Sequence, residues 1–356
     1  PRHLSDGVSA DRMSRFGIKE HMGSTMAANE SSLFEAFLNR HDSHSWNQIL
    51  DSLLPSIHEV DRAATRIWFA FFPLDLALAL KESEDPAQLA EELLLLGKFA
   101  LKDQIDTSHA FLYGHRYWPE VKKAVAAHAS SNKAPSSLNL EAQIKEVATA
   151  AAASTEKDLS LLLGITAVGF MSLQQVGAEA FSAAPGKVSL RPNVAAKSPD
   201  KVLKARAKGD GQGIFGFLKG EQETYPITFD ENESDARFRL IRGQELTTAA
   251  AADARHFTER DPRLLGSEGP IPVQCRAAAC GTCWVGILAG AEKLADVDRI
   301  EGNRIKEFGY INTDDPKPII RLACRAQAFG AVSLVIPPWN GVFGKYLAAR
   351  EESKDL

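Results

Sequence analysis

Apolar residues recur at helical spacing through the first half of the chain. Residues 31–183 are rich in Ala, Leu, Glu and Lys, and glycine and proline fall mostly where helices would end. Asp85-Pro86 predicts one helix start, because aspartate caps a helix and proline suits its first turn. The apolar positions that continue this helix are three or four residues apart: Leu89, Leu93, Leu96 and Ala100. We expect about five to seven helices, packed as an all-α bundle.

The pattern changes to short apolar runs after residue 224. Runs with strand character cover residues 225–229, 237–241, 284–288, 319–323 and 332–336. Two helical stretches, near 247–255 and 298–308, lie between them. Mixed short strands with two helices predict an α+β domain.

A basic segment rich in glycine and proline separates these two regions. Residues 184–220 carry eight lysines and arginines against two aspartates, and their glycines and prolines predict no regular element. We expect an arm held against an acidic neighbouring subunit. The predicted organisation is an irregular segment 1–30, a helical domain 31–183, a basic linker 184–223, a second domain 224–340 and a C-terminal tail 341–356.

Length, charge and hydropathy exclude some classes of protein. The 356 residues exceed one typical domain, and the net charge of −5 argues against nucleic-acid binding. No apolar run reaches about 20 residues, and segments 67–80 and 159–176 are interpreted as buried helices rather than membrane spans. We expect a cytoplasmic protein, and peripheral association with a membrane complex is compatible with this. Because the sequence starts at Pro1 rather than methionine, we expect a processed or truncated product.

All four cysteines lie in the last third of the chain. Three of them occur within nine residues, with C-x4-C-x2-C spacing, and the fourth follows about forty residues later: Cys275, Cys280, Cys283 and Cys324. Such clustering predicts a metal site in a reducing compartment rather than disulfides. The spacing is that of [2Fe–2S] proteins. Small loop residues such as Ala277 and Gly281 would let backbone N–H groups point at the sulfurs.

These motifs resemble those of a plant-type ferredoxin domain, over residues 225–338. Residues 275–283 match the family's Cys-Arg-Ala-Gly-Ala-Cys-x-x-Cys loop, except that Ala278 replaces the glycine. Arg321-Leu-Ala-Cys324 resembles the family's stretch around the last cysteine ligand. Phe308-Gly-Tyr310 is also similar to the family. The resemblance implies a β-grasp fold, a [2Fe–2S] cofactor and one-electron transfer. It also implies that Cys275 and Cys280 bind one iron, and that Cys283 and Cys324 bind the other.

Two features differ from chloroplast ferredoxins. The segment between Cys283 and Cys324 is longer, which predicts an enlarged helix and loop near residues 290–317. Residues 221–356 carry 21 acidic and 17 basic residues, so the domain is nearly neutral. A freely diffusing ferredoxin docks through a strongly acidic patch, and the resemblance therefore favours a fixed subunit.

Other interpretations of the cysteines fit less well. Structural zinc sites usually pair two short hooks, whereas here one hook has three cysteines and the other has one. Cys280-Gly-Thr-Cys283 alone is similar to a dithiol redox motif, which leaves the other two cysteines without a role. Trp284 follows in place of histidine, which excludes covalent c-type haem at this motif.

The helical half contains histidines that could serve a second cofactor or a packing surface. They are His41, His44, His58, His109, His115 and His128. No P-loop and no GxSxG motif occurs, and no GxGxxG follows a predicted strand. The leading hypothesis is a non-catalytic iron–sulfur subunit that transfers electrons within an oxidoreductase complex, with the helical domain and basic arm docking on partner subunits. The alternatives are an assembly or sensory protein with a structural cluster, and an enzyme with a second metal or haem.

Overall fold

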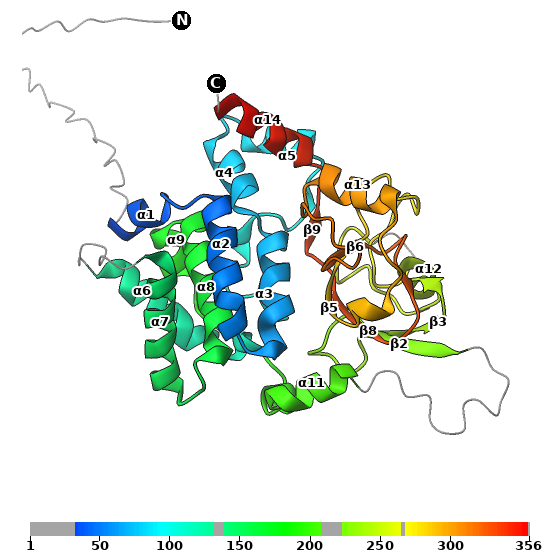
Figure 1. Cartoon of the computed structure of the whole chain (residues 1–356), viewed down its shortest axis with the longest axis horizontal. Helices are drawn as coiled ribbons and strands as arrows, with labels where there is room; N and C mark the ends of the chain where they lie inside the picture. The colour runs from blue at the N-terminus through cyan, green and yellow to red at the C-terminus, as the bar shows by residue number, and fades with distance from the viewer. Residues whose placement is uncertain (1–32, 132–138, 208–222, 265–267, 355–356) are drawn as a thin grey trace, which may run out of the picture. The chain divides into compact units, whose positions relative to one another are not determined.

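The first half of the chain folds into helices packed around the buried helix α8. The computed structural model describes residues 33–131, 139–207, 223–264 and 268–354, which belong to one compact unit, Ser32–Leu356. The expected irregular segment 1–30 lies outside the described residues. The α-helices of this half are α1 (Leu33–Leu38), α2 (Ser43–Leu53), α3 (Glu59–Phe71), α4 (Leu74–Glu82), α5 (Pro86–Glu92), α6 (Trp118–Ser130), α7 (Leu140–Thr155), α8 (Ser160–Val176) and α9 (Ala178–Ala183), as Figure 1 shows. Short 3-10 turns complete it: η1 (Leu54–Ser56), η2 (Leu101–Asp103) and η3 (Tyr113–Tyr117).

The described part of residues 33–183 contains more α-helices than the five to seven expected. Pro73 is the N-cap of α4 and divides one apolar stretch into α3 and α4, because proline cannot donate within a helix. Gly177, at φ +85°, separates α8 from α9 in the same way that glycine ends many helices. The predicted helical character is confirmed, and the predicted count is wrong.

Helix α5 begins as predicted and ends earlier than predicted. The Asp85 carboxylate accepts hydrogen bonds from the backbone N–H groups of Ala87 and Gln88 at 3.1 and 2.9 Å. The continuation of the helix to residue 100 is wrong, because Leu94 takes a left-handed φ of +52°. Beyond it, β1 (Leu96–Gly97) pairs antiparallel with β9 (Trp339–Asn340), which lies more than 240 residues away in the chain.

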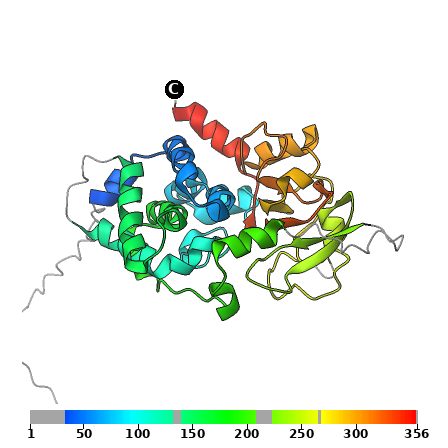
Figure 2. The same ribbon diagram turned by 60° about the horizontal axis from the view of Figure 1, so that its bottom comes forward.

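The basic segment contains two helices, which the sequence interpretation excluded. They are α10 (Pro192–Ala195) and α11 (Pro199–Ala207). Each starts with proline in its first turn, and Lys204 and Arg206 in the last turn of α11 favour the negative end of its dipole. Figure 2 shows α11 between the helices and the sheet. The remainder of the predicted linker, residues 208–222, lies outside the described residues.

The second half is built on a mixed sheet with the strand order β3-β2-β8-β5-β6. Strands β2 and β8 are parallel, and the other neighbours are antiparallel. Apolar and charged residues alternate along β3, so Phe238 and Leu240 are buried while Arg237 and Arg239 are exposed. The strands are β2 (Thr224–Thr228), β3 (Arg237–Ile241), β4 (Gln244–Glu245), β5 (Trp284–Ala289), β6 (Ile320–Leu322), β7 (Gln327–Ala328) and β8 (Val332–Val335).

The five predicted strands are confirmed to within one residue at each end. Helix α13 (Arg299–Phe308) is confirmed, and with η6 (Ala291–Lys293) it occupies the expected enlargement between residues 290 and 317. Helix α12 (Leu246–Ala250) is shorter than predicted. The predicted tail contains helix α14 (Gly344–Lys354), which the sequence interpretation did not anticipate.

Helix α3 packs directly against β5, so the helical half and the sheet share one core (Figure 1). A Cβ atom placed on Gly286 would lie 2.5 Å from Ile67, which shows how close the two elements are. The ring of Phe71 contacts that of Trp284 at a centroid distance of 4.9 Å. This contact anchors the strand that follows the third cysteine. The predicted domain boundaries at residues 183, 223 and 340 stay predictions.

One described segment, Glu59–Glu82, is long and apolar enough to cross a membrane by length and composition alone. It corresponds to α3 and α4, and half of its apolar window is buried inside the structure. The other apolar segment singled out from the sequence is α8, which is buried along most of its length.

Candidate iron–sulfur site

The four cysteines lie in three segments that the sheet brings together. Cys275 and Cys280 sit in the loop before β5, and Cys283 directly precedes that strand. Cys324 follows β6, which pairs antiparallel with β5 so that Trp284 lies opposite Leu322. This register places the two strand-end cysteines beside each other.

The thiols meet as two pairs. Cys275 and Cys280 hydrogen-bond to each other, and so do Cys283 and Cys324. This is the pairing that the ferredoxin resemblance implies for the two irons. In the described part of the chain, no three His, Cys, Asp or Glu side chains converge as they would around one metal ion. A binuclear cluster takes two thiolates on each iron, so two pairs fit it.

Hydrogen-bond donors of the loop point at the sulfurs. The N–H of Ala278 donates to Cys324 Sγ at 3.3 Å, and that of Ala279 to Cys275 Sγ at 3.2 Å. The Thr282 hydroxyl donates to Cys280 Sγ at 3.1 Å. Such donors stabilise negative charge on thiolate sulfur and help to set the reduction potential of a cluster.

The same contacts shift the thiol pKa values in opposite directions within the buried pair. The thiol of Cys283 donates to Cys324, and this bond together with burial raises the pKa of Cys283 well above its usual range. That bond and the Ala278 N–H lower the pKa of Cys324, although burial opposes them. Burial also raises the pKa of Cys280, but the Thr282 hydroxyl and backbone outweigh it, so the net pKa is lowered. Metal binding would displace the remaining thiol protons.

The loop adopts left-handed backbone at positions without glycine. Ala278 has φ +55° and is 2% exposed, and it occupies the position where the ferredoxin loop carries glycine. Gly281 has φ +68°, and a Cβ there would lie 2.9 Å from the Tyr310 hydroxyl. The left-handed conformation at Ala278 costs roughly 1–2 kcal/mol relative to glycine.

Tyr310 packs against the loop that carries the first cysteines. Its ring stacks on Trp284 with centroids 3.8 Å apart and planes 15° apart, and its hydroxyl donates to the Gly281 carbonyl at 2.7 Å. Burial raises the pKa of Tyr310, so the phenol stays neutral and keeps its proton for this bond. The sequence marked Tyr310 as similar to the family, and the structure gives it a supporting contact.

A buried ion pair fixes the strand that carries Cys324. The Arg321 guanidinium donates to both Glu301 oxygens at 2.8 Å, and each side chain is 1% exposed. Glu301 also accepts the N–H of Leu322 at 2.9 Å, which ties β6 to α13. Sequence reasoning missed this pair. The available signal was a charged residue in the short apolar run that precedes a cysteine.

The two thiol pairs differ in their access to solvent. Cys283 and Cys324 are buried, at 2% and 1% exposure, whereas Cys275 and Cys280 are half-buried. The loop residues Arg276, Ala277 and Ala279 are exposed. The open side of the site is therefore the loop that carries the first two cysteines.

The six histidines of the helical half lie at separate places, apart from one buried pair. His115 and His109 hydrogen-bond through their Nδ1 atoms at 2.9 Å, and His109 also reaches the Ile105 carbonyl. Burial lowers the pKa of His109 well below its usual range and that of His115 to about 4, so both rings are neutral. The other four each hydrogen-bond within the protein: His41, His44, His58 and His128.

Comparison with known proteins identifies the C-terminal region. Residues 263–328 match the family model of the 2Fe-2S iron-sulfur cluster binding domain. Neither the curated proteins nor the solved structures give a match to the chain. The matched region holds a [2Fe–2S] cluster, and this supports a role in electron transfer.

Proposed function

We propose that this chain is the iron–sulfur subunit of a larger redox complex and relays single electrons through its cluster. Cys275 and Cys280 hold one iron, and Cys283 and Cys324 hold the other. The observation that carries the assignment is the meeting of these thiols in two pairs. A mononuclear zinc site would need its donors around one point, so the paired arrangement favours two irons.

The cluster, when bound, supplies exchange of one electron between two iron oxidation states. The chain's own residues set the environment. The N–H groups of Ala278 and Ala279 stabilise charge on the sulfurs, and burial of Cys283 and Cys324 keeps water from one side. Electrons enter and leave through the exposed loop around Cys275 and Cys280, where a partner can approach closely.

The architecture supports this assignment at a finer level. A parallel β2–β8 pair flanked by antiparallel neighbours, with α13 beside the sheet, favours a β-grasp fold for the second half. The helices gathered around α8 favour a bundle for the first half. These features support the proposal that the C-terminal region is a ferredoxin-like module built onto a helical base.

The function of the helical half in this proposal is attachment. The ring contact between Phe71 and Trp284 fixes the cluster strand to α3, and the nearly neutral charge of residues 221–356 offers little for long-range steering. The helical half and the basic segment dock on partner subunits. The complex operates in the cytoplasm, either free or at a membrane surface, where thiols stay reduced.

Replacement of each cysteine by serine tests the ligand set. We expect each Cys→Ser variant to lose most of the visible absorbance of the cluster, while Ala277→Ser, at an exposed position of the same loop, retains it. Iron and sulfide analysis with EPR spectroscopy of the reduced protein reads out the result. A Cys→Ser variant with full iron content and an unchanged spectrum would remove that cysteine from the ligand set.

A further inference from the structure

A cavity of about 260 Å³ lies where the helical half, α11 and the sheet meet. The helical half contributes Phe111 and Arg116, and α11 contributes Val202 and Arg206. The sheet closes the remaining side with residues of β2, β3 and β8. No cysteine lines this cavity, so it is separate from the iron–sulfur site.

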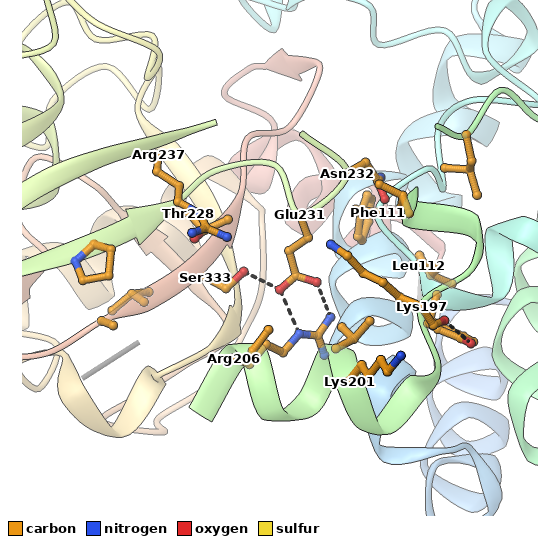
Figure 3. A pocket seen from close by; sticks show the side chains of 18 of the residues that line it. Phe111, Leu112, Lys197, Lys201, Arg206, Thr228, Glu231, Asn232, Arg237 and Ser333 are labelled. Atoms are coloured by element: carbon orange, nitrogen blue, oxygen red, sulfur yellow. Dashed lines mark hydrogen bonds and ion pairs between the residues drawn. The ribbon is translucent and has the colours of Figure 1, made fainter. Parts of the chain in front are cut away.

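The floor of the cavity is rigid. Arg206 donates to both oxygens of Glu231 at 2.8 Å, and Ser333 donates to the same carboxylate at 2.6 Å (Figure 3). The third donor of Arg206 reaches the Val60 carbonyl of α3 at 2.8 Å, and its side chain is 8% exposed. The single carboxylate of the lining is therefore neutralised before any ligand enters.

The rim is also held in place. The carbonyl of Lys197 accepts hydrogen bonds from the Tyr113 hydroxyl and from Arg116, both at 2.9 Å. The Asn232 amide donates to the Ala110 carbonyl at 2.9 Å, which ties the loop after β2 to the helical half. The cavity is thus formed in advance, as binding sites for small molecules usually are.

Positive charge remains without an anionic partner on the walls. Lys197, Lys201 and Arg237 line the cavity, and none of them forms an ion pair with a described carboxylate. Figure 3 shows Lys197 reaching into the cavity on one side and Arg237 standing on the other side of Glu231. Three cations that pair with no described carboxylate line this cavity and favour an anion. Lys197 is half-buried, so its attraction for an anion is screened less than that of the exposed Lys201 and Arg237.

Apolar side chains cover the rest of the wall. Phe111 and Leu112 line the cavity from the helical half, Val202 lines it from α11, and Val332 lines it from the sheet. We infer that this cavity binds a small organic anion, with its carboxylate or phosphate among Lys197, Lys201 and Arg237 and its apolar body against Phe111 and Val202. Such a ligand contacts the helical half, α11 and the sheet together, and its binding stabilises their packing by mass action.

Calorimetric titration of the cluster-loaded full chain tests this inference. The probes are phenyl phosphate and benzoate, with benzyl alcohol as the neutral control and benzamidine as the cationic control. We expect at least one anion to bind with Kd below about 1 mM and to raise Tm, and neither control to do so. Preference between the two anions identifies the headgroup.

Variants locate the binding. Lys197→Gln combined with Arg237→Gln should weaken the bound anion at least tenfold and leave the EPR spectrum of the cluster unchanged. Lys204→Gln, on the same helix α11 but outside the lining, should bind as the wild type does. Absence of binding by both anions, equal binding of benzyl alcohol, or equal weakening in Lys204→Gln would overturn the inference. None of these outcomes bears on the cluster ligands.

Discussion

The indole Nε1 of Trp339 donates a hydrogen bond of 2.7 Å to the carbonyl of Phe71, across 268 residues of chain. The carbonyl of Trp339 in turn accepts the Nε1–H of Trp284 at 2.7 Å, and Trp284 directly follows Cys283. All three rings are buried. A short series of hydrogen bonds therefore connects the end of α3 with the strand beside the iron–sulfur site.

Trp339→Phe should weaken this connection. The substitution leaves the buried Phe71 carbonyl without its donor, which costs about 1–3 kcal/mol of unfolding free energy. Trp46→Phe is the matched control, because it removes an indole hydrogen bond to Gln174 inside the helical half. Urea unfolding followed by circular dichroism and by cluster absorbance should show faster cluster loss in Trp339→Phe than in Trp46→Phe. Equal rates would contradict the connection.

Ala278→Gly should stabilise the cluster loop. Alanine at φ +55° carries the left-handed penalty of roughly 1–2 kcal/mol, which glycine avoids at some entropic cost. We expect a gain of about 1 kcal/mol in unfolding free energy. Ala277→Gly in the same loop should instead lower the unfolding free energy by about 0.5 kcal/mol, because glycine increases the conformational entropy of the unfolded chain and relieves no strain in the folded one. If both variants are destabilised alike in urea titrations, the assigned loop conformation is wrong.

The buried pair of Glu301 and Arg321 should be needed for cluster retention. Glu301→Gln leaves the Arg321 guanidinium uncompensated at 1% exposure, which costs about 3–5 kcal/mol. Glu307→Gln on the same helix breaks partly exposed pairs with Arg304 and Lys345 and should cost no more than about 1 kcal/mol. Iron content after gel filtration is the measurement. Full iron retention in Glu301→Gln would show that β6 holds Cys324 without this pair.

Asp61 should make the protein less stable as the pH rises. Burial raises its pKa from 3.8 to about 6, although the N–H groups of Gly114 and Tyr113 favour the charged form. The folded state holds this proton more tightly than the unfolded state does. Its stabilising contribution is complete below the ordinary pKa of 3.8 and is lost as the pH passes about 6.

The expected loss is roughly 3 kcal/mol in unfolding free energy between about pH 4 and pH 7. The lowered pKa values of His109 and His115 change the stability in the opposite direction over the same range. The Asp61 contribution is therefore the difference in slope between the wild type and Asp61→Asn in urea titrations. The asparagine variant is also less stable throughout, because its amide group faces a backbone N–H. A wild-type slope that persists unchanged in Asp61→Asn would assign the dependence to other groups.

Much of the structure could be predicted from local patterns in the sequence. Alternating apolar residues located the strands around Phe238, and cysteine spacing located the site, because both depend on residues close in the chain. The pairing of Leu96 with Asn340 could not be predicted, since the helical spacing that includes Leu96 continues past the true helix end. The partners of Arg321 and Arg206 depend on tertiary packing, which periodicity does not encode.

The histidines of the helical half, His109 among them, are compatible in sequence with a second cofactor or a packing surface. In the structure His109 pairs with His115 and lies against Trp118, whose indole donates to Asp106 at 2.8 Å. Hydrogen bonds among buried groups account for these residue types. The sequence could not distinguish such a network from a ligand set, because both require inward-facing polar side chains.

Redox titration of the purified chain, followed by EPR spectroscopy, tests the electron-relay assignment most directly. We predict two irons and two sulfides per chain, uptake of one electron at about −400 mV, and a rhombic signal after reduction with dithionite. A colourless zinc protein, or a cluster that does not take up and release an electron reversibly, would contradict this assignment.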